Sequence, residues 1–92
     1  MEEVELKRDG DDYVIVIDGE AKFRREADGT WDCSEPGWGV RGPVQLHDSR
    51  SPHSWEGWEF IRPDGTRLDH VFGLNEDGTG FICHITETRR MS

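Results

Sequence analysis

Long apolar runs are missing from this sequence. The longest stretch of consecutive apolar residues is Tyr13 to Ile17, whereas a transmembrane helix needs about 20 apolar residues. The chain opens with Met1-Glu2-Glu3 and shows neither the basic segment nor the apolar segment of a secretory signal. These absences predict a cytoplasmic protein that has no membrane partner.

Enzyme signatures are missing as well. No G-x-S-x-G elbow and no P-loop occur in the 92 residues. His47, Asp48 and Ser49 are the residue types of a hydrolase triad, but consecutive residues of an extended chain point to alternate sides and cannot form that relay. We therefore expect a non-catalytic protein without a cofactor, and a small enzyme is kept as an alternative.

Metal-ligand pairs are sparse, since the chain has two cysteines, four histidines and no C-x-x-C. In a cytoplasmic protein the two cysteines are expected to be reduced. His47 and His53 have the H-x₅-H spacing of structural zinc sites. Cys83 and His84 are consecutive in a predicted strand, so their side chains should face opposite sides of the sheet. One alternative is nevertheless a zinc-stabilised module, whose ligands would come from Cys33, Cys83, His84, His47 and His53.

Basic residues are also few. Eleven basic residues face 20 acidic ones, which gives a formal net charge of −9, and residues 1–35 hold 12 of the acids but only 5 of the bases. Proteins that bind nucleic acid usually present a basic patch, so direct binding of nucleic acid is not expected. An acidic surface instead attracts a basic partner over long range, with a strength that falls as salt rises.

Asp-Gly dipeptides are the most regular feature that the sequence does contain. They occur at 9–10, 18–19, 28–29, 64–65 and 77–78, and three of them extend to Asp-Gly-Thr. Asp-Gly between alternating segments is a strong hairpin signal, because both residues tolerate the positive φ angles of a type I′ turn. Five hairpin turns are therefore predicted.

The segments between these turns have the composition and alternation of short strands. They cover residues 3–7, 13–17, 21–25, 58–60, 68–72 and 81–86, and 13–17 is apolar on both faces like a central strand. No window keeps a helical period of apolar residues. We predict one all-β domain over 1–92, an antiparallel meander of about seven or eight short strands closed as a barrel or a two-layer sandwich.

The strand pattern fails between about Ser34 and Ser54. That stretch contains three of the four prolines together with Gly37, Gly39 and Gly42. We predict a long loop over 34–54, with a short helix over 44–48 as an alternative for that part. Loops of this length in a compact domain are more often functional than idle.

Tryptophan and arginine in and beside this loop are candidate contact residues, because both are enriched at interface hot spots. They are Trp38, Arg41 and Trp55; for the two tryptophans the alternative is packing against the core. The acids of the first strand and its turn are the second candidate group. They are Glu2, Glu3, Glu5, Asp9, Asp11 and Asp12.

Together these features favour a small acidic binding protein, of the inhibitor, immunity or anti-defence type. It would occlude a basic surface on a nuclease or another nucleic-acid-handling protein, and its carboxylates would imitate a track of phosphates. A homo-oligomer is a further alternative, in which exposed tryptophans would pair across a symmetric interface.

Overall fold

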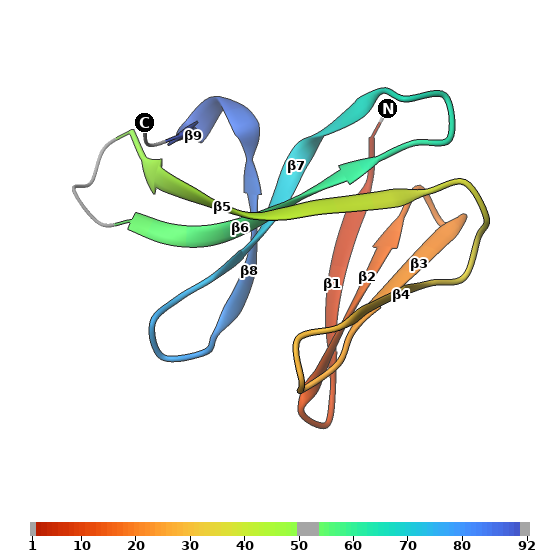
Figure 1. Cartoon of the computed structure of the whole chain (residues 1–92), viewed down its shortest axis with the longest axis horizontal. Coiled ribbons are helices and arrows are strands. Elements are labelled where there is room, and N and C mark those ends of the chain that lie inside the picture. The colour runs from red at the N-terminus through yellow and green to blue at the C-terminus, as the bar shows by residue number, and fades with distance from the viewer. Residues whose placement is uncertain (1, 50–53, 91–92) are drawn as a thin grey trace.

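The computed structural model describes residues 2–49 and 54–90. These residues form nine strands and one short 3₁₀-helix: β1 (Val4–Asp9), β2 (Asp12–Ile17), β3 (Ala21–Arg25), β4 (Trp31–Cys33), β5 (Gly39–Asp48), β6 (Ser54–Ile61), β7 (Arg67–Leu74), β8 (Gly80–His84), η1 (Ile85–Glu87) and β9 (Thr88–Arg90). All strand pairs are antiparallel. They make a four-stranded sheet in the order β1-β2-β3-β4 and a five-stranded sheet in the order β8-β7-β6-β5-β9 (Figure 1).

The all-β prediction is confirmed, and the strands number nine over the described residues, where seven or eight were predicted. The five-stranded sheet is strongly curled, and η1 connects its two edge strands, β8 and β9 (Figure 1). Within the described ranges no strand pairing joins the two sheets, so they do not form one closed barrel.

All five Asp-Gly pairs lie in hairpins between consecutive strands, as predicted. The turn geometry differs from the prediction in most of them. Asp18 and Gly19 both have positive φ, 53° and 69°, as a type I′ turn requires. In the other four pairs only the glycine has positive φ, so the predicted type I′ turn is wrong there.

The three Asp-Gly-Thr segments share one loop structure. In each, the glycine N–H donates to the carbonyl three residues earlier, and the threonine carbonyl accepts the N–H of the residue four positions earlier. The aspartate carboxylate accepts hydrogen bonds from the threonine two residues later, and these bonds lower the pKa of Asp28, Asp64 and Asp77 below the ordinary value. Each segment is therefore a longer hairpin loop in which only the glycine needs positive φ.

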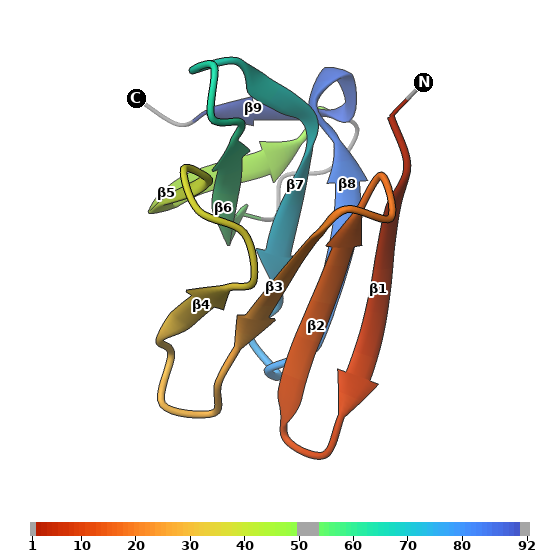
Figure 2. The same ribbon diagram turned by 90° about the vertical axis from the view of Figure 1, so that its right-hand side faces the viewer.

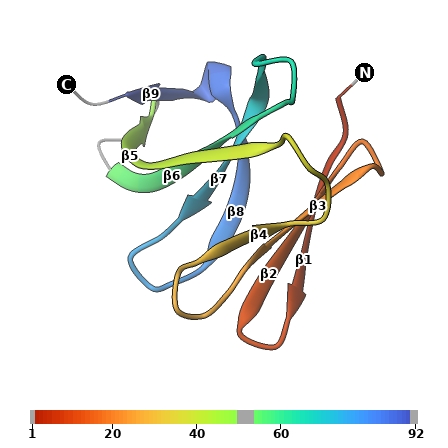
Figure 3. The same ribbon diagram turned by 45° about the vertical axis from the view of Figure 1, so that its right-hand side comes forward.

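The two sheets form two layers (Figure 3), and residues from both make one hydrophobic core. Its buried members are Tyr13, Ile15, Ile17, Ala21, Phe23, Trp58, Phe60, Leu68 and Phe72. Aromatic rings link the two layers, with ring centroids 4.9 Å apart for Phe23 and Phe60 and 5.4 Å apart for Tyr13 and Phe72. The few apolar residues of this chain thus suffice for a core, because large rings bury much surface each.

The other face of the five-stranded sheet carries a second, smaller cluster. Its buried members are Leu46, Trp55 and Val71. Phe81 packs on it, 4.9 Å from the Trp55 ring. Glycines provide the room for these side chains: a Cβ on Gly57 would lie 2.4 Å from Leu46 Cδ1, and one on Gly73 would lie 2.4 Å from Phe81 Cζ.

Glu59 is the one charged side chain buried among the described residues, at 4% exposure. It lies on β6, and its carboxylate accepts hydrogen bonds from Arg67 on β7 (3.2 Å) and from Arg90 on β9. Both arginine side chains are about half exposed. This ion-paired group ties the last strand to the centre of the curled sheet.

The predicted long loop over 34–54 is wrong for about half of its length. β5 covers Gly39–Asp48, including the stretch considered as a short helix, and pairs with β6 and β9. The alternation that marks a strand is lost because the register with β6 shifts between Arg41 and Val44, around the Gly42-Pro43 pair. Residues 50–53 of the predicted loop lie outside the described residues.

Candidate functional site

Three of the five Asp-Gly hairpins project from the same end of the molecule. They are the β1–β2, β3–β4 and β7–β8 turns, all at the lower edge in Figures 1 and 2, and we call residues 9–12, 26–30 and 75–79 the hairpin end. The β2–β3 and β6–β7 turns lie at the opposite end. The hairpin end brings together seven acids that are far apart in the sequence: Asp9, Asp11, Asp12, Glu26, Asp28, Glu76 and Asp77.

A hollow of about 350 Å³ lies at the hairpin end and is lined by residues of all three hairpins. Asp11, Glu26 and Asp28 bring three carboxylates to it and Arg25 brings one guanidinium, so the lining is net negative, while Tyr13 and Leu74 supply apolar surface. This volume is at the lower end of the range for ligand pockets. The hollow therefore has the size and charge to accept a cationic side chain of a partner.

Hydrogen bonds hold the three hairpins in fixed relation to one another. The Tyr13 hydroxyl donates to the Gly78 carbonyl (3.1 Å) and accepts the Gly80 N–H (2.8 Å), which fastens the β7–β8 hairpin to the four-stranded sheet. The Asp12 carboxylate accepts the Ala27 N–H (3.0 Å) and so fastens the β3–β4 hairpin to β2. The three hairpins that bear the carboxylates are thus positioned before any partner arrives.

Arginines neutralise only part of this charge. Arg24 donates to Asp9 (2.8 Å) and to Asp12 (3.0 Å), and these hydrogen bonds raise the pKa of its guanidinium above the ordinary value. Arg8 and Arg25 are the other two basic residues beside these turns, and both guanidinium groups lie over aromatic rings. The seven acids therefore outnumber the three neighbouring arginines, and the hairpin end is net negative.

The six acids proposed from the sequence divide between the two ends of β1. Asp9, Asp11 and Asp12 belong to the hairpin end. Glu2 and Glu3 precede β1 at its opposite end, and Glu5 lies on the strand between them and the turn. The sequence interpretation missed the acids from the other two hairpins, although their position beside Asp-Gly turns was a signal that could have been used.

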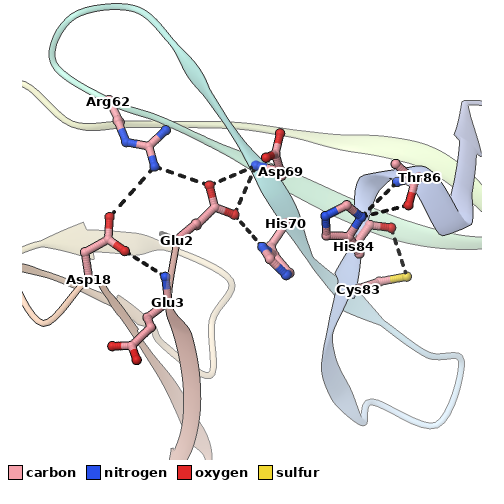
Figure 4. Close-up of polar contacts among 9 residues, drawn as sticks. All are labelled: Glu2, Glu3, Asp18, Arg62, Asp69, His70, Cys83, His84 and Thr86. Atoms are coloured by element: carbon pink, nitrogen blue, oxygen red, sulfur yellow. Dashed lines mark hydrogen bonds and ion pairs between the residues drawn. The ribbon is translucent and has the colours of Figure 1, made fainter.

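Glu2 in particular is not a surface charge (Figure 4). Its side chain is only 13% exposed, and its carboxylate accepts hydrogen bonds from the His70 ring, the Asp69 N–H (3.1 Å) and Arg62 (3.2 Å). Burial opposes its ionisation, but these hydrogen bonds outweigh burial, and the pKa of Glu2 lies below its ordinary value. Glu2 therefore links the segment before β1 to β7 of the other sheet.

The residues of the zinc alternative do not converge. Cys33 packs against the main core and Cys83 against the smaller cluster, and neither forms a disulfide. His84 lies on the face of β8 opposite Cys83, with its ring 4.9 Å from His70 (Figure 4). His47 lies on β5, and His53 falls outside the described residues. Within 2–49 and 54–90, no three His, Cys, Asp or Glu side chains are placed to hold a metal ion.

The three hot-spot candidates have different environments. Trp55 is 9% exposed and belongs to the smaller cluster, next to the start of β6. Trp38 is half-buried, with its ring edge-on to Phe23 at 5.8 Å. Arg41 is exposed on β5. Of the two tryptophans, therefore, only Trp38 keeps substantial surface for a partner.

No protein-family model, curated protein or solved structure matches this chain. In the part of the chain that the structure describes, no helix is long and apolar enough to cross a membrane. The function must therefore be argued from the charges and shape of the candidate site.

Proposed function

We propose that this is a small acidic, non-catalytic binding protein whose hairpin end docks on a basic surface of another protein. The observation that carries the proposal is the convergence at one end of three hairpins that bear seven acids, three of which line one hollow. The carboxylates of the hairpin end are negatively charged, like the phosphates of a nucleic acid. This likeness suggests the class of the partner, because nucleases and other nucleic-acid-handling proteins present basic surfaces. Docking there would occlude the surface and inhibit the partner.

Several carboxylates must act together for such docking to be strong. An exposed ion pair contributes only about 0–1 kcal/mol by itself, because water screens both charges. The bonds from Tyr13 and Asp12 hold the hairpins in place, so less conformational freedom is lost when a partner binds. Long-range attraction would mainly raise the association rate and would weaken as salt increases.

The test measures binding of nona-lysine and nona-arginine peptides by fluorescence anisotropy at about 50 and 200 mM salt. The variant is Asp11→Lys with Glu26→Lys, which reverses two exposed charges of the hairpin end. We expect at least tenfold weaker binding, which corresponds to about 1.4 kcal/mol. The matched control is Glu3→Lys with Glu20→Lys, the same change of net charge at the opposite end.

Binding that depends only on net charge would weaken equally in both variants. That result, or binding insensitive to salt, would refute a docking surface at the hairpin end.

A further inference from the structure

A second hollow lies at the edge strand of the four-stranded sheet, β4. Its volume is about 330 Å³, and we call it the aromatic hollow. The residues that line it are Phe23, Trp31, Asp32, Cys33, Trp38 and Val40. No basic residue is among them.

Three segments supply the three rings of the aromatic hollow. Phe23 comes from β3, Trp31 from β4, and Trp38 from the connection that precedes β5. Phe23 is 1% exposed and fixed in the main core, whereas both tryptophans are only half-buried. The hollow therefore has a fixed apolar wall and two indole rings that a partner can reach.

The chemistry of this lining favours a cation. Aromatic faces attract cations, and the exposed Asp32 adds a negative charge. One of these rings already has a guanidinium beside it within the molecule: Arg25 lies 5.8 Å from the ring centroid of Trp31, and 4.5 Å from that of Trp58, which is not part of the hollow. Lys22 and Arg24 alternate with Phe23 along β3, so their side chains point to the opposite face of the strand.

We propose that the aromatic hollow takes one arginine side chain of the basic partner. This inference rests on the proposed function and adds the chemical group that is recognised. A guanidinium is planar and weakly hydrated, so it stacks on indole rings better than the compact, strongly hydrated ammonium group of lysine. The hollow would thus give the protein a preference for arginine-rich surfaces over equally charged lysine-rich ones.

The first test compares nona-arginine and nona-lysine, which have equal charge, in the binding assay described above. We expect nona-arginine to bind about three- to tenfold more tightly. Cys33 lines the hollow and reports its occupancy, because bound peptide should slow alkylation of Cys33 by iodoacetamide. Cys83 packs in the cluster on the far face of the other sheet and is the internal control, whose alkylation rate should not change.

The variant Asp32→Asn removes a charge from an exposed side chain and should reduce the preference for arginine. Trp38→Leu should abolish it, and thermal unfolding of this variant checks that the fold survives the loss of the contact with Phe23.

The outcomes separate the two proposals. If both peptides bind equally, Cys33 is not protected and the hairpin-end variant still weakens binding, the aromatic hollow is refuted and the proposed function stands. If neither peptide shows salt-sensitive binding, the proposed function fails and the inference fails with it. A preference for arginine that Asp32→Asn and Trp38→Leu both reduce supports the inference.

Discussion

Substitution of Gly57 by alanine tests the packing of the smaller cluster. A Cβ at this position would lie 2.4 Å from Leu46 Cδ1 and 3.0 Å from Trp55 Cζ3, well inside the ordinary carbon–carbon separation of about 3.5–4.0 Å. Leu46 and Trp55 are 5% and 9% exposed, so neither side chain can move away without losing packing. Overpacking of this kind costs about 1–3 kcal/mol.

Alanine also offsets part of this cost, because glycine within a strand is disfavoured by about 0.5–1 kcal/mol relative to alanine. The free energy of unfolding of Gly57→Ala should therefore fall by up to about 2.5 kcal/mol, which lowers the melting temperature by up to roughly 20 °C in a domain of this size. The assay is urea unfolding, followed by both tryptophan fluorescence and far-ultraviolet circular dichroism.

Gly39→Ala is the matched control on the neighbouring strand. Its Cβ would meet only Ile61 Cβ at 3.9 Å, and Gly39 does not have positive φ. This variant should gain stability by up to about 1 kcal/mol. If Gly57→Ala proved as stable as Gly39→Ala, the close approach of Leu46 to the β6 backbone would be wrong.

Three further substitutions probe the buried polar groups. Because the pKa of Glu2 is lowered on folding, its ionisation stabilises the fold above the unfolded value of about 4.5, and this stabilisation is lost as pH falls through the folded value. Glu2→Gln should therefore melt below the wild type at pH 7, and the difference between the two melting temperatures should shrink as pH is lowered from 4.5. Tyr13→Phe should lower the free energy of unfolding by about 1–2 kcal/mol and speed hydrogen exchange at the Gly80 amide, and unchanged exchange would contradict the role of its hydroxyl. Glu59→Leu should change the free energy of unfolding by less than about 2 kcal/mol, because both arginine partners are half exposed and water can solvate them once the carboxylate is gone. A loss above about 3 kcal/mol would show that the ion pairs contribute more to stability than the burial of Glu59 costs.

Local rules explain why the hairpins were predictable. A turn depends on the φ angles and side-chain hydrogen bonds of about four residues, and Asp-Gly meets those needs wherever it occurs. The strand β2 was predictable for a similar reason, since an apolar run of five residues is typical of a strand covered on both faces. The loop type within the Asp-Gly-Thr segments was missed, because the carboxylate-to-threonine bonds extend the turn beyond the two residues considered.

Long-range contacts explain what was missed. Strand β5 contains Gly42 and Pro43, and only its pairing with β6 and β9 holds the interrupted segment extended. From the sequence, Glu2 was interpreted as a surface acid. Its partner His70 is 68 positions away, so no local pattern indicates the contact. Trp55 was weighed for both a core and a contact role, and the structure places it in a cluster with residues from β5 and β7.

By itself, the sequence determined where the chain turns, that it forms strands, and that acids accompany the turns. In a meander, alternate turns lie at the same end of the sheet, so even the grouping of the β1–β2 and β3–β4 turns follows from strand order along the chain. Only the tertiary structure decided that the β7–β8 turn joins them and that three rings meet at the edge of β4. The packing of one sheet on the other fixes those positions, because it depends on contacts between residues that no local pattern connects.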